Sequence, residues 1–280
     1  MSAVLTIASL TLRESVRRRL VYAFLAISAV IVGLSAWGFD RLSHTNSLTS
    51  GEANLAVPEA LILFMFMFSF VLALSASAMA SPSIYSEIES GVLMTVVTRP
   101  VRRLEVLLGK WLGLTVLLAG YAAVVCALEF AVVRWVSGYL PPNPWLVAVY
   151  LFAEGMLLLT LSMLLSTRLP VIAAGVIAVA VFGAGWLAGV VGTLGTTLNL
   201  AALRTIGQVG RMLLPTDGLW HGAIFYLQSP SVISANLSGG REGNPFYAQG
   251  APSAAYLLWV AAWFVLVLGA AVFSFERREL

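Results

Sequence analysis

Charged side chains are scarce in this sequence. Only 10% of the 280 residues are charged, whereas 60% are hydrophobic. A water-soluble domain usually carries about 25% charged residues, so this little charge cannot cover the surface of a soluble protein of this length. The apolar runs are long and do not alternate with polar residues, which excludes a membrane β-barrel. Because backbone groups in lipid must pair internally, such runs indicate membrane-spanning helices.

Residues that bind metals or act as nucleophiles are also rare. The one cysteine, Cys126, lies in an apolar run, so a disulfide within one chain and a cysteine-built metal site are excluded. The two histidines, His44 and His221, lie in different connecting segments and form no ligand cluster. No serine stands in a Gly-x-Ser-x-Gly context. We therefore expect no metal site and no catalytic residue.

A phosphate-binding loop is missing as well. Gly109-Lys110 is followed by Trp111, and Leu104 stands where a Walker A motif has glycine. We therefore expect no ATP hydrolysis by this chain, no cofactor in it, and no enzyme activity of its own. The net charge of +3 is modest and reflects loop residues that set membrane orientation, so we also expect no nucleic-acid partner.

Six apolar runs are long enough to cross a membrane, since each crossing helix needs roughly 20 residues. The predicted fold class is therefore an all-α integral membrane protein with six transmembrane helices. The predicted spans are about Leu20 to Phe39, Pro58 to Ala80, Val106 to Val133, Trp145 to Ser166, Leu169 to Val191 and Ala254 to Phe275.

Basic residues are distributed unevenly between the two sides of these spans. If the N-terminus is inside, the outer side holds only Arg41, Arg134, Arg204, Arg211 and Arg241. Positive residues favour the cytoplasmic face, so we predict cytoplasmic termini and a multi-pass protein of the plasma (bacterial inner) membrane. The other eleven lie inside: Arg13, Arg17, Arg18, Arg19, Arg99, Arg102, Arg103, Lys110, Arg168, Arg277 and Arg278.

The segment before the first span, residues 1–19, has the pattern of an amphipathic helix in the cytoplasmic interface. Glu14 lies four residues before Arg18, a favourable helical pair. The predicted apolar face consists of Leu5, Ala8, Leu12 and Val16. A simple basic flank without defined structure is the alternative.

Residues 20–280 are predicted to form one transmembrane domain with two elaborate connections. The outer loop 192–253 shows helical periodicity around Arg204 and Arg211, which predicts short interfacial or re-entrant helices. The cytoplasmic connection 81–105 begins as a helix with apolar residues at every fourth position. That helix should end before Pro100, and a new helix should begin with Pro100 in its first turn.

This cytoplasmic connection carries a recognisable pattern. An acidic residue precedes Ser90-Gly91, an apolar run follows, and then come Arg99-Pro100-Val101-Arg102-Arg103, Glu105 and Leu108-Gly109-Lys110. The pattern resembles the ABC-2 family of ATP-binding-cassette transporter permeases. The N-terminal helix, the six spans, the long outer loop and the ending 275–280 extend this resemblance over essentially the whole chain.

The resemblance implies a function and partners. In the ABC-2 family the corresponding segment contains a coupling helix that docks into a groove of an ATPase subunit. The implied role is that of an exporter permease that pairs with a second, identical or homologous permease and with an ATPase subunit that holds ATP and Mg²⁺. By position, the ATPase-coupling candidates are Glu87, Glu89, Gly91, Arg99, Pro100, Arg102 and Arg103. A basic loop that only fixes topology is the alternative.

Two acids lie within predicted spans, where ionisable residues are costly and often functional. Glu154 and Glu129 could each line an intramembrane pathway. Alternatively, Glu129 lies near the interface beside Arg134, and Glu154 is protonated or bonded to a neighbouring helix. Small residues would allow close packing of the helices: Gly113, Gly120, Gly175, Gly183, Gly185 and Gly189.

Two other functions compete with ATP-driven export. An ion-coupled secondary transporter would use ionisable residues near the bilayer centre, and Glu154 fits that expectation. An ABC-type complex could instead transmit force to a periplasmic or extracellular partner without exporting cargo. The sequence leaves the substrate unidentified, because membrane lipid contacts the same kind of apolar surface that would line a pathway for an apolar cargo.

Overall fold

The computed structural model describes residues 3–44, 50–89, 102–238 and 244–278. In these ranges all regular structure is helical, and six helices are long and apolar enough to cross a membrane. The prediction of an all-α, six-span protein is therefore confirmed. The elements are α1 (Ala3–Val16), α2 (Arg19–Ser43), α3 (Ser50–Ala80), α4 (Pro82–Glu89), α6 (Arg103–Ser137), α7 (Pro144–Ser166), α8 (Val171–Thr197), α9 (Ala201–Leu213), α10 (Thr216–Leu227), α11 (Pro230–Ser238) and α12 (Ala254–Glu276).

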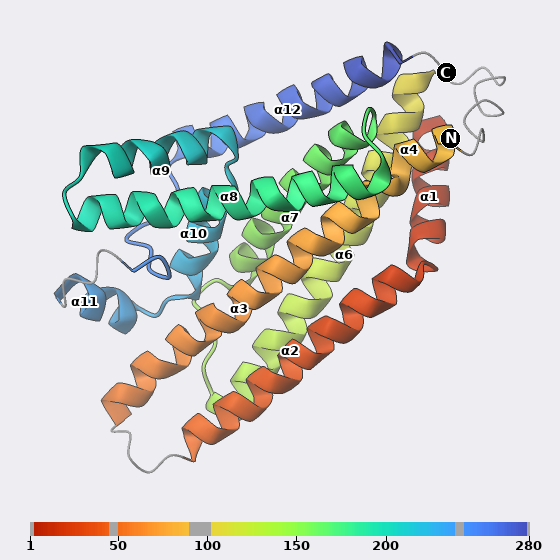
Figure 1. Cartoon of the computed structure of the whole chain (residues 1–280). Coiled ribbons are helices and arrows are strands. Elements are labelled where there is room, and N and C mark those ends of the chain that lie inside the picture. The colour runs from red at the N-terminus through yellow and green to blue at the C-terminus, as the bar shows by residue number, and fades with distance from the viewer. Residues whose placement is uncertain (1–2, 45–49, 90–101, 239–243, 279–280) are drawn as a thin grey trace.

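The long helices form a bundle with two distinct ends (Figure 1). The first residues of α1, the short helix α4, the start of α6 and the end of α12 lie at one end, called here the α4 end. The connection between α8 and α9 lies at the other, called here the opposite end. Segments that are far apart in sequence therefore meet at the α4 end.

Several helices begin or end away from the predicted limits. α3 begins at Ser50 and continues through Pro58, although a proline inside a helix removes a backbone hydrogen bond and usually kinks the helix. α6 begins at Arg103 and not near Pro100, since Arg102 has an extended backbone with ψ of 144°. Glu105 Oε2 accepts a hydrogen bond from the Arg102 backbone N–H at 2.9 Å, which stabilises this start.

Helix α7 forms the centre of the bundle. In its apolar window 61% of the residues are buried, against 17% in α2 and α12 and 22% in α8. It contacts α3, α6, α10 and α12. Consequently α2, α8 and α12 are peripheral, and their outer faces are available to lipid or to another membrane protein.

Helix α1 packs closely against the first half of α6. Cβ atoms added at Gly109 and Gly113 would lie 2.7 Å from Ile7 Cβ and 2.6 Å from the Ala8 carbonyl oxygen. Ile7 and Ala8 thus face α6, whereas Leu5 and Val16 of the predicted apolar face are not covered by protein. The glycines of α6 decide the packing, since they let backbones approach where larger apolar side chains would not fit.

Three short helices, α9, α10 and α11, lie within residues 192–253. α9 folds back along α8, and a Cβ atom added at Gly192 would lie 2.7 Å from the Gly207 Cα atom. α10 is buried along most of its length and contacts α7, α8 and α3. This segment is therefore part of the bundle and not a loose external loop.

Candidate functional site

Helix α4 follows α3 after a single turn residue, Ser81. The Ser83 hydroxyl donates to the Ala80 carbonyl at 2.6 Å, and the Ser86 hydroxyl donates to the Pro82 carbonyl. These local bonds satisfy carbonyl groups at the junction between the two helices. Helix α4 thus lies at one end of the bundle, next to the start of α6 and the end of α12 (Figure 1).

The apolar side of α4 is inserted between membrane helices. Ile84 has no exposed surface and belongs to a separate buried cluster with residues of α6, α7 and α12. Burying such a side chain contributes about 1.5–3 kcal/mol. A displacement of α4 would therefore act on three long helices at once. The partners in the cluster are Leu107, Met163, Ala271 and Phe275.

A buried cation joins α4 to α6. Lys110 is only 7% exposed, and its ammonium donates to the Ser83 carbonyl oxygen at 2.7 Å. A buried charge is tolerated only where hydrogen bonds compensate for the loss of water. The hydrogen bond from Lys110 therefore holds the first turn of α4 against α6.

The end of α12 is held at the same place by Arg103. Its Nη1 group donates to the carbonyl oxygens of Glu276 at 3.1 Å and Arg278 at 2.8 Å. A cation at a helix C-terminus pairs with carbonyls that lack partners in the helix. Arg103 thus fixes the end of the last helix to the start of α6.

A second arginine connects the chain end to α4 and to the turn between α7 and α8. Arg278 donates to the Thr167 carbonyl oxygen, and its guanidinium carbon lies 5.3 Å from the centre of the Tyr85 ring. The Thr167 hydroxyl is 2.8 Å from that of Ser274 on α12. The α4 end is therefore one connected assembly of α4, α6, α7 and α12.

The predicted ATPase-coupling residues fall in different settings at this end. Glu87 and Glu89 lie in α4, and Glu89 is exposed. Arg102 is exposed at the start of α6, whereas Arg103 is engaged with the end of α12. The other three predicted residues, Gly91, Arg99 and Pro100, lie outside the described residues.

The acids within the spans have hydrogen-bond partners on neighbouring helices. Glu129 is 3% exposed and accepts from the Ser35 hydroxyl of α2 at 3.0 Å. Its carboxyl group is thus buried toward α2, while its position near the interface beside Arg134 stays an alternative. Glu154 is also 3% exposed and accepts from the Ser69 hydroxyl of α3 at 2.8 Å. A bond between Glu154 and a neighbouring helix is one of the alternatives that the sequence left open.

Sequence reasoning missed an ion pair at the opposite end. Asp217 lies in the first turn of α10 with its side chain 2% exposed, and its Oδ2 is 2.5 Å from Arg211 Nε of α9. The sequence pointed to this region only through the helical spacing of polar residues between positions 204 and 211. The fold-back of α9, which brings Arg211 to Asp217, depends on the turn at Pro215 and could not be read from that spacing.

A family model described as ABC-2 family transporter protein matches residues 5–280. That range includes α4, the six long helices and the short helices α9 to α11. The chain belongs to the ABC-2 transporter family. The match confirms the resemblance to this family that the sequence motifs indicated. No curated protein sequence matches the chain.

Membership in the ABC-2 family places the chain among membrane components of transport systems that are not themselves catalytic. Permeases of the family generally work with an ATPase subunit. Together with the six long apolar helices, membership also indicates a multi-pass membrane protein.

Proposed function

We propose that this ABC-2 chain is the permease subunit of an ABC exporter and that its α4 end is the contact for a separate ATPase subunit. Two permeases, identical or homologous, would form the translocation pathway for a substrate that the sequence does not identify. ATP and Mg²⁺ would be held by the ATPase. In the proposed orientation the α4 end, with both termini, faces the cytoplasm.

The observation that carries this proposal is the attachment of α4 to the bundle. Ile84 packs among residues of α6, α7 and α12, and Lys110 binds the Ser83 carbonyl. A partner that moves α4 as a rigid body would therefore move the long helices, which is the kind of transmission that alternating access needs. A loop that only fixed topology would not require a buried lysine and a buried isoleucine at this junction.

The peripheral helices support the pairing of two permeases. Only 17% of the apolar windows of α2 and α12 are buried within one chain. These helices expose large apolar residues such as Val30, Trp37, Leu258 and Val265. A second permease could cover part of this surface, and lipid would cover the rest.

A double charge reversal tests the contact. Glu87→Lys with Glu89→Lys should reduce stimulation of the ATPase and its co-purification with the permease, while membrane insertion stays normal. The matched control is Glu14→Lys, which reverses an exposed acid of α1 whose pair with Arg18 is on the surface and contributes little. Unchanged binding and stimulation in the double variant would overturn the assignment of α4.

The competing functions give different results in reconstituted vesicles. Transport that continues with an inactivated ATPase and follows a proton gradient would replace the proposal by an ion-coupled transporter. ATP hydrolysis that never moves a tested cargo, but alters an outer partner, would favour force transmission. The proposal requires ATP-dependent movement of a defined cargo.

A further inference from the structure

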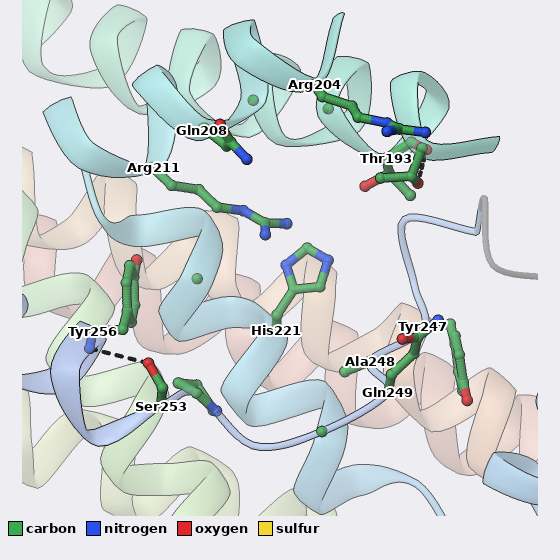
Figure 2. A pocket seen from close by; sticks show the side chains of 16 residues that line it. Thr193, Arg204, Gln208, Arg211, His221, Tyr247, Ala248, Gln249, Ser253 and Tyr256 are labelled. Carbon is green, nitrogen blue, oxygen red and sulfur yellow. Dashed lines mark hydrogen bonds between the residues drawn. The ribbon is translucent and has the colours of Figure 1, made fainter. Parts of the chain in front are cut away.

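A polar cavity lies at the opposite end of the bundle, between α8, α9, α10 and the start of α12 (Figure 2). Its volume is about 610 Å³, in the range of small-molecule sites. Its lining contains Arg204, Arg211 and His221 and, within the described part of the chain, neither Asp nor Glu. The cavity is separate from the α4 end, so its role does not follow from contact with an ATPase.

The two faces of α9 have different chemistry. Arg204, Gly207, Gln208 and Arg211 recur at helical spacing and all line the cavity. Because Gly207 packs directly on Gly192 of α8, this polar face is held close to the neighbouring helix. The other side of α9 borders an almost wholly apolar groove with Ile206, Val209 and Leu213. The arginines are thus placed on the cavity side and away from the apolar side.

Asp217 holds the side chains of Arg211 and His221 in place. Its carboxylate pairs with Arg211 Nε, and its backbone carbonyl oxygen accepts from His221 Nδ1 at 2.8 Å. A Cβ atom added at Gly189 would collide with the Asp217 carboxylate, so α8 closes the space behind it. Figure 2 shows Arg211 extending toward the His221 ring. The acid is therefore behind Arg211, and Arg211 and His221 line the cavity.

Several donors remain for a ligand. Within the described chain Arg211 uses only Nε, so Nη1 and Nη2 have no protein acceptor there. Arg204 donates from Nε to Gly195 at 3.2 Å and from Nη2 to Asn199 at 2.5 Å, which leaves Nη1. The hydroxyl of Ser253 accepts from Tyr256 N, and its own hydrogen remains. These groups bind water when the cavity is empty, and an anion can replace that water.

We propose that this cavity binds an oxyanion of the phosphate type. Two arginines with one buried acid behind them leave an excess positive charge, and guanidinium groups bind phosphate through paired, charge-assisted hydrogen bonds. The donors come from Arg204 and Arg211 of α9 and from Ser253 at the start of α12, and all three residues line the cavity. The phosphate can belong to a soluble compound or to a phospholipid headgroup.

The first test uses inorganic phosphate on the purified full-length protein, with any subunits that co-purify, in a phosphate-free detergent. Phosphate is titrated at constant ionic strength, and the thermal unfolding midpoint is recorded. The midpoint should rise for the wild type. Arg204→Gln should raise the apparent Kd about tenfold or more, since it removes a charge-assisted bond. The control Arg134→Gln removes an exposed arginine outside the cavity and should leave the Kd unchanged.

A second variant guards against misfolding. Arg211→Gln alone would leave the buried Asp217 without its partner, so the double variant Arg211→Gln with Asp217→Asn removes both charges and keeps polar groups in place. Its folded state is checked by its midpoint without phosphate. A folded double variant that binds phosphate as tightly as the wild type would overturn the proposal.

A lipid arm distinguishes the two sources of phosphate. The protein is placed in nanodiscs of phosphatidylcholine with or without phosphatidylglycerol, and retained lipids are counted by native mass spectrometry. Retention of phosphatidylglycerol that is lost in Arg204→Gln, with no effect of inorganic phosphate, supports a headgroup site. A phosphate effect without lipid retention supports a soluble ligand. If neither occurs, or if Arg134→Gln removes the effect equally, the proposal fails.

Discussion

At the scale of single residues, glycine determines how closely the helices approach. The glycines that the sequence suggested for close packing differ in how much space surrounds them. Gly113 and Gly189 face atoms that a Cβ would overlap, whereas Gly120 and Gly183 have nothing within 4 Å. Glycine therefore permits close contact between helices at some positions, whereas at others no neighbouring atom requires it.

Gly113→Ala should detach α1 from α6. Its Cβ would lie 2.6 Å from the Ala8 carbonyl oxygen, and a backbone atom cannot move aside as a flexible side chain does. Overpacking of this kind costs about 1–3 kcal/mol. The expected result is a lower thermal unfolding midpoint together with faster protease cleavage within α1.

Gly120→Ala on the same helix is the matched comparison, because a Cβ there meets no atom within 4 Å. It should leave the midpoint unchanged or raise it slightly, since alanine favours the helix over glycine by roughly 1 kcal/mol. Equal destabilisation by both substitutions would contradict the close contact between α1 and α6.

At the scale of elements, both polar and apolar contacts hold α4 against the long helices. Lys110 binds the Ser83 carbonyl from α6, and Ile84 enters the cluster of α6, α7 and α12. A helix of eight residues is too short to be stable alone in water. Its stability and its position therefore depend on these contacts.

Lys110→Met should loosen α4 while preserving the bundle. Methionine keeps the length of the side chain but removes the donor to Ser83, and the loss of such a bond costs about 1–3 kcal/mol. Amides of α4 should exchange with deuterium about tenfold faster, and stimulation of the ATPase should fall. Arg17→Met at the same end removes an exposed cation instead and should change neither quantity. Normal exchange in Lys110→Met would mean that this bond does not hold α4.

The limits of sequence prediction are also visible at this scale. Apolar runs predict the six long helices because each run must cover a helix in lipid. Backbone conformation at Arg102 and the continuation of α3 before Pro58 depend on local hydrogen bonds, so those helix limits were missed. Glu129 could be recognised as an acid within a span, but its partner Ser35 is 94 positions away along the chain. Such pairs require the tertiary arrangement.

The same distinction applies to the candidate site. The motif placed Glu89 and Arg102 in one segment, and the structure shows both exposed at the α4 end. It gave no sign that Arg103 holds the end of α12, because that contact joins residues 172 to 175 positions apart. Local pattern identifies the segment, whereas the contacts that connect it to the long helices come from the fold.

At the scale of the whole molecule, the two ends differ in charge. The α4 end carries Lys110, Arg168 and Arg277, whereas Arg204 and Arg211 of the opposite end line the cavity. Since positive residues are retained on the cytoplasmic side, we expect the α4 end inside and the cavity outside. The proposed oxyanion site would then be reached from the outer side of the membrane.

Cysteine labelling in cells tests this orientation directly. The single native cysteine, Cys126, is buried and is replaced by alanine as the background. Glu14→Cys in the last turn of α1 and Thr197→Cys at the end of α8 each introduce one thiol at an exposed position. A membrane-impermeant maleimide should label Thr197→Cys in intact cells and Glu14→Cys only after permeabilisation. The reverse pattern would place α4 on the outer side, where no ATP-driven partner could reach it, and would remove both the proposed coupling contact and the outer position of the cavity.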